Sequence, residues 1–103
     1  MALRQLKDLR ATNPDNVALV AQLGIAEAQA GNLDSAIRYI GVAASMEPNN
    51  ASHFYNMAIM AEQAGAKQEA VRYYEQALEI DSIYGGGRSI PREAVYTRLA
   101  KLR

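Results

Sequence analysis

Apolar residues recur along the chain at the three- and four-residue spacing of α-helices, and not at the alternating spacing of strands. The first clear stretch follows this spacing with Val17, Val20, Leu23, Gly24 and Ala28. Asp15 or Asn16, just before them, offers the short polar side chain that caps the start of a helix. The pattern therefore predicts an amphipathic helix that begins near residue 17.

Glycine and proline mark the ends of the predicted helices. Gly31 follows the first apolar stretch, where a helix C-terminus needs a residue that tolerates positive φ. We expect a second helix from Leu33 to Met46, with Asp34 in its first turn, where a negative charge suits the helix dipole. Pro48 prevents that helix from continuing. The two helices therefore form a hairpin that turns at Gly31.

The hairpin is repeated. Gly65 lies 34 residues after Gly31, and the segments QAGNLDSAIRY and QAGAKQEAVRY align there without a gap. A fixed period of this length is typical of a solenoid built from supersecondary units. The fold class that we predict is all-α, a solenoid of antiparallel helix hairpins.

Small residues recur where the predicted helices would touch. Ala36 and Ala43 lie seven residues apart on one face of the second helix, and Gly24 lies on the facing helix. Small side chains at a contact allow two helix axes to approach closely. The next unit repeats the arrangement with Ala58, Ala70 and Ala77. A larger side chain at such a contact would overpack it, at a cost of roughly 1–3 kcal/mol.

The period and its small residues resemble the tetratricopeptide repeat (TPR) family. Its signature positions carry, in the first unit, Val20, Leu23, Gly24, Glu27, Ala36, Ile40, Ala43 and Pro48. In the second unit they carry Phe54, Met57, Ala58, Ala61, Ala70, Tyr74, Ala77 and Ser82. The departures are Glu27 and Ala61, where the family favours tyrosine, and Ser82, where it favours proline. The resemblance implies a right-handed superhelical solenoid whose concave inner surface binds proteins.

Both flanks extend this interpretation. Residues 2–12 resemble the second helix of a preceding repeat, and we predict a fragment of a longer TPR-containing protein; a natural chain that begins with a half repeat is the alternative. At the other end, three glycines predict a flexible loop, followed by a helix that begins at Ser89 or Ile90 and covers the last repeat with Val95, Leu99 and Leu102. The predicted division is a partial repeat over 1–13, TPR units over 14–48 and 49–82, a loop over 83–89 and a capping helix over 90–103.

Composition narrows the function. The formal net charge is zero, so the chain has no basic footprint for nucleic acid, and no long apolar run predicts membrane insertion. Cysteine is absent and histidine occurs once, which argues against disulfides and metal sites. We predict no cofactor, and the compartment is left open.

No constellation of residues predicts catalysis. His53 has no second histidine or cysteine nearby in sequence, so we interpret it as a structural or surface residue. The GGGRS segment before the last helix could cradle an anion, but it lacks the ending and the preceding strand of a phosphate-binding loop, which favours a linker. The carboxylates are scattered over helical faces. We therefore predict that the chain is not an enzyme.

The resemblance implies where a partner would bind. In the family, the inner surface comes mainly from the first helix of each unit. The corresponding candidates in this chain are Ala21, Gln22, Ile25, Gln29, Tyr55, Asn56, Ile59, Gln63 and Arg98. One TPR subclass clamps C-terminal carboxylates with five such positions; Asn56 and Arg98 match two of them, whereas Ala21, Ile25 and Ala94 do not match the others.

Two functions follow. The first is a protein–protein interaction scaffold that binds an apolar peptide or amphipathic helix in the groove and helps to assemble a multiprotein complex. The second is an architectural spacer or self-association segment, with a homodimer formed through the N-terminal helix or the groove and the partner site elsewhere in the full-length protein.

Overall fold

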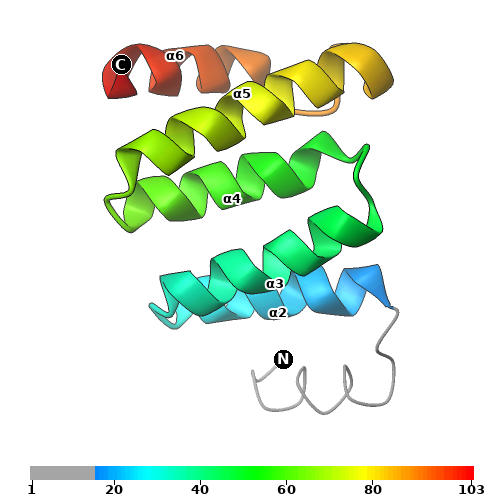
Figure 1. Ribbon diagram of the computed structural model, residues 1–103, viewed down its shortest axis with the longest axis vertical. Helices are drawn as coiled ribbons and strands as arrows, with labels where there is room; N and C mark the ends of the chain where they lie inside the picture. The colour runs from blue at the N-terminus through cyan, green and yellow to red at the C-terminus, as the bar shows by residue number, and fades with distance from the viewer. Residues whose placement is uncertain (1–15) are drawn as a thin grey trace.

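Helices α2 to α6 are stacked in chain order in a computed structural model, which describes residues 16–103 (Figure 1). No strand occurs in this range. The helices are α2 (Val17–Gln29), α3 (Leu33–Met46), α4 (Ala51–Gln63), α5 (Lys67–Tyr84) and α6 (Arg92–Leu102). Helices α2 and α3 form one antiparallel hairpin and α4 and α5 form the next (Figure 1). The predicted partial repeat over 1–13 lies outside the described residues.

The helix ends follow the predicted chemistry. The Asn16 side chain, one of the two predicted caps, caps α2 and accepts a hydrogen bond from the Leu19 amide at 3.2 Å. Gly31 and Gly65 follow α2 and α4 with φ angles of 87° and 81°, in the left-handed region that glycine adopts without steric cost. Helix α3 has the bounds predicted from the sequence.

Small side chains bring the helices of each hairpin together. All five predicted contact alanines are fully buried: Ala36, Ala43, Ala58, Ala70 and Ala77. A Cβ atom on Gly24 would lie 2.6 Å from Cδ1 of Ile40, which leaves no room for a methyl group between α2 and α3. The close approach predicted from the sequence is therefore confirmed.

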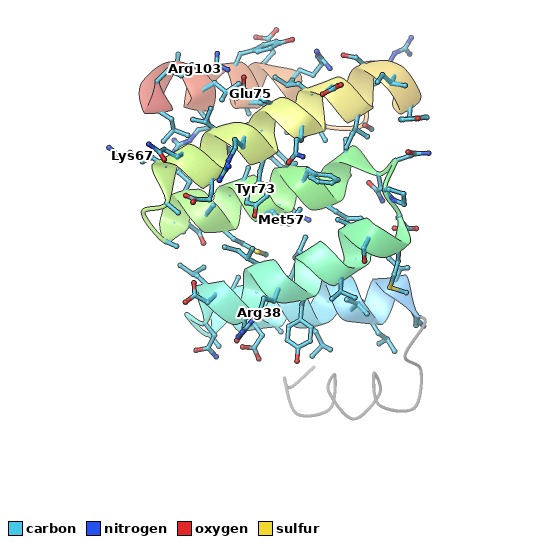
Figure 2. All side chains as sticks on the ribbon, in the orientation of Figure 1. Arg38, Met57, Lys67, Tyr73, Glu75 and Arg103 are labelled. Carbon is cyan, nitrogen blue, oxygen red and sulfur yellow. The ribbon has the colours of Figure 1, made fainter. Side chains whose placement is uncertain are left out.

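The core continues from one hairpin to the next. Buried Ile40 of α3 packs with Met57 and Met60 of α4, and Figure 2 shows Met57 between these two helices. Half-buried Tyr73 of α5 contacts this cluster and also the cluster that surrounds Tyr74. A continuous core of this kind makes each hairpin the support of its neighbour, as in a solenoid.

Helix α5 is longer than predicted. It runs through Ile83 to Tyr84, two residues that were predicted to lie in the loop. Helix α3 ends just before Pro48, whereas the corresponding residue of the next unit is Ser82, which has a backbone N–H and lies inside α5. The departure from the family pattern at Ser82 thus extends the helix into the predicted loop 83–89.

The glycine-rich segment after α5 is a hydrogen-bonded turn organised by Asp81. This carboxylate is fully buried, and its Oδ1 accepts from the amide of Ser89 at 2.6 Å and from its hydroxyl at 2.5 Å. Its Oδ2 accepts from Arg92 at 2.6 Å. These contacts, the Ser89 hydroxyl first, lower the pKa of Asp81. Asp81 therefore links the end of α5 to the turn and to the first residue of α6.

Helix α6 begins later than predicted. Pro91 is its N-cap, since the Pro91 carbonyl accepts from the Val95 amide at 3.1 Å, and Ser89 and Ile90 precede the helix. The predicted apolar stripe is confirmed, because Val95 and Leu99 are buried and Leu102 packs against the same cluster.

Candidate peptide-binding groove

A cleft of about 310 Å³ opens between α4, α5 and α6. Its lining comprises Tyr55, Ile59, Glu62, Gln63, Tyr74, Ala94 and Arg98. The four α4 residues fall at helical spacing on one face of that helix. The two α6 residues, Ala94 and Arg98, lie four residues apart and so share one face of α6. The volume is at the lower end of ligand pockets, which span about 300–1,000 Å³.

Four of the nine predicted groove residues line this cleft: Tyr55, Ile59, Gln63 and Arg98. The other five lie outside it: Ala21, Gln22, Ile25, Gln29 and Asn56. Ala21 is half-buried against the α3–α4 cluster, whereas Ile25 is exposed on α2. The cleft thus brings together candidates from α4 and α6, and the four candidates on α2 do not line it.

Aromatic side chains form one wall of the cleft. The rings of Tyr55 and Tyr74 lie 6.2 Å apart and are tilted by 55°, a spacing that suits an edge-to-face contact. Tyr74 is buried, and burial together with the neighbouring Tyr55 raises its pKa. Tyr74 therefore keeps its proton and donates a hydrogen bond to Oε1 of Glu62 at 2.8 Å.

Glu62 and Arg98 form an ion pair across the cleft. Nε of Arg98 donates to Oε1 of Glu62 at 3.1 Å, and the guanidinium also contacts Oε2. The Glu62 side chain is 16% exposed and that of Arg98 44%. Arg98, which matched one position of the family's carboxylate clamp, is thus already bound by a carboxylate of this chain.

The nine groove candidates predicted from the sequence do not include Glu62 or Tyr74. The repeat pattern places Glu62 at an inner-surface position of α4, but it did not predict the pairing of Glu62 with Arg98. Arg98 lies on the inner face of α6, the helix that takes the place of the first helix in the next unit. This arginine was the signal that could have identified the partner of Glu62. Tyr74 was predicted to belong to the core, and it does, but its hydroxyl also reaches the cleft.

His53 is a structural residue, one of the two roles predicted for it. It is buried, and its Nε2 lies 2.7 Å from Oε1 of Glu47, at the loop between α3 and α4. This contact and a hydrogen bond from Asn50 lower the pKa of Glu47. Across residues 16–103, no group of three or more acidic or histidine side chains could hold a metal ion. No helix in that range has the length and apolarity to cross a membrane.

Solved structures with a similar fold include the Yersinia enterocolitica type III secretion translocator chaperone SycD, with a TM-score of 0.84 and 18% identity. Two structures of MamA follow, with TM-scores of 0.76 and 0.71 and identities of 19% and 16%. Each match covers 97% of this chain, which spans 68% of SycD and 50% and 61% of the two MamA chains. No protein-family model and no curated protein matches the sequence. The likenesses show that the fold is TPR-like.

Proposed function

We propose that this chain, a TPR-like solenoid, is a protein–protein interaction scaffold that binds an apolar peptide or amphipathic helix of a partner. The α4–α6 cleft receives the apolar side chains of that segment, and the exposed amides along the inner face bind its backbone. The scaffold in this way helps to assemble a multiprotein complex. We assign it no catalytic role.

The lining of the α4–α6 cleft is the main observation that supports this proposal. Tyr55 and Ile59 are half-buried, so part of each apolar surface stays open to a ligand, and the Gln63 amide lies beside them. An apolar concavity with a few polar groups is the usual form of a binding site. The name of SycD, a translocator chaperone, supports a function in which a protein segment is held.

A displayed library of random peptides of about 12 residues tests the proposal. We expect the protein to select peptides with apolar side chains at regular spacing, and Ile59→Glu or Tyr55→Ala to weaken their binding tenfold or more, because a charge or a gap replaces an apolar contact. Ile83→Glu is the matched control, since Ile83 is 62% exposed on α5 and does not line the cleft. Equal loss in the control, or selection of no peptide, would refute the proposal.

Self-association is a second candidate function, favoured by the outer face of α6. Tyr96 corresponds by repeat position to Val20, which is fully buried, and to Phe54, which packs against the core, yet Tyr96 is 48% exposed. A second copy could cover this face. The predicted alternative contact through the N-terminal helix lies outside the described residues. Sedimentation equilibrium tests this function: a mass that rises with concentration and returns to that of a monomer in Tyr96→Glu supports it, and a strict monomer refutes it.

A further inference from the structure

We infer that Glu62 sets the charge preference of the groove: by holding Arg98 in an internal ion pair, it makes the cleft select neutral apolar segments and reject acidic ones. The inference rests on the proposed function, because it concerns the ligand of the same cleft. It assigns to Glu62 the role of a specificity-determining residue.

The geometry of the pair supports this role. Glu62 uses both carboxylate oxygens, Oε1 with Nε of Arg98 and with the Tyr74 hydroxyl, and Oε2 with the rest of the guanidinium. Two parallel contacts between a guanidinium and a carboxylate form the strongest common arrangement of such a pair. Tyr74 is buried and holds its proton, so it keeps the carboxylate in place.

A partner carboxylate would have to displace this internal one. Glu62 is tethered to the same molecule, so its effective concentration at Arg98 exceeds that of any free ligand. A displaced Glu62 would also lose its partners while largely shielded from water, which is costly for a charged group. An acidic side chain therefore gains little from Arg98.

The rest of the lining carries no charge. Tyr55, Ile59, Gln63, Tyr74 and Ala94 are all neutral, so the Glu62–Arg98 pair leaves the cleft with a net charge of zero. Lys101 lies nearly one turn beyond Arg98 on α6, but it does not line the cleft and is exposed, so salt screens its attraction for an acidic ligand. The complementary partner segment is neutral and apolar.

Two reciprocal variants test the inference with the same peptide library. Glu62→Gln keeps the shape of the side chain and leaves the positive charge of Arg98 facing the cleft, so the selected peptides should become enriched in Asp and Glu. Arg98→Gln leaves Glu62 uncompensated, so the peptides should become enriched in Lys and Arg. Glu79→Gln is the matched control, because it removes one exposed carboxylate from α5 outside the cleft.

Affinities make the comparison quantitative. We expect an acidic peptide selected by Glu62→Gln to bind that variant at least tenfold more tightly than the wild-type protein in fluorescence anisotropy, with a difference that shrinks as salt is added. Thermal melts verify that each variant is folded, and Arg98→Gln tests the inference independently of Glu62→Gln.

The outcomes are distinct. A wild-type pool already rich in acidic residues, or variant pools that match the Glu79→Gln pool, would overturn the inference and leave the proposed function intact. Failure of all four proteins to select any peptide would overturn the proposed function and the inference with it.

Discussion

Gly24 and Gly41 offer a matched pair of substitutions with opposite expected signs. Both glycines lie inside helices, Gly24 in α2 and Gly41 in α3. Alanine in a helix interior is more stable than glycine by about 0.5–1 kcal/mol, because glycine loses more backbone entropy on folding. Propensity alone would therefore favour alanine equally at both positions.

At Gly24, close packing reverses the sign of the expected change in the free energy of unfolding. The new Cβ would lie 2.6 Å from Cδ1 and 2.7 Å from Cγ1 of Ile40, and 3.2 Å from the carbonyl oxygen of Ala36. Ile40 is fully buried, so its side chain cannot swing into open space. Overpacking of this kind costs about 1–3 kcal/mol, which exceeds the gain in helix propensity. We expect Gly24→Ala to lower the free energy of unfolding by up to about 2.5 kcal/mol.

Gly41→Ala has no such clash. The atom nearest to its new Cβ is Sδ of Met57 at 4.0 Å, an ordinary van der Waals distance. We therefore expect this variant to be more stable than the wild type by about 0.5–1 kcal/mol. In a domain of this size, each kcal/mol shifts Tm by about 4–8 °C. Circular dichroism melts should place the two variants several degrees apart, on opposite sides of the wild type.

A double variant identifies the cause. Ile40→Val removes Cδ1, the atom closest to the new methyl group, so Gly24→Ala should cost less in that background than in the wild type. Equal cost in both backgrounds, or a rise in Tm for Gly24→Ala alone, would show that close packing of α2 against α3 does not determine the residue at this position.

Three further changes probe the turns and caps. Gly65→Ala should cost roughly 1–2 kcal/mol in chemical denaturation, because its φ of 81° is strained for alanine. Asn50→Ala should cost about 1 kcal/mol in the same assay, since the Asn50 side chain caps α4 through the Ser52 amide at 3.0 Å. The folded-state pKa of Asp81 is lowered, so its contribution to stability is present above its ordinary pKa of 3.8 and is lost as pH falls through the folded-state value. Melts on acidification should show a smaller loss of Tm in Asp81→Asn than in the wild type; equal losses would contradict this.

Local chemistry made much of the fold predictable. Gly31 lies before α3 and Pro48 after it, and the backbone conformations that each residue allows predict both ends of the helix. The 34-residue period predicts α4 in the same way. The end of α5 and the start of α6 differ from the prediction. Ser82 permits a helix that the family pattern would have ended, and Pro91 caps α6, so this helix begins after the predicted Ser89 or Ile90.

The candidate groove was less predictable. Tyr55, Ile59 and Gln63 share one helix, so helical spacing alone places them together. The Glu62–Arg98 pair joins residues 36 apart in the sequence, across a turn that breaks the period. Its formation depends on how that turn orients α6, which no local pattern specifies.

The Asp81 contact has a consequence for redesigning the length of this protein. A whole 34-residue unit inserted at the loop between α3 and α4 would replace their contact with two contacts of the same kind, because the units there repeat with one period. The turn after α5 is different: Ser89 and Arg92 must meet one shielded carboxylate at fixed offsets of 8 and 11 residues. We therefore expect the chain to accept whole units before α4, and an insertion between Asp81 and Ser89 to break the contacts of this buried carboxylate.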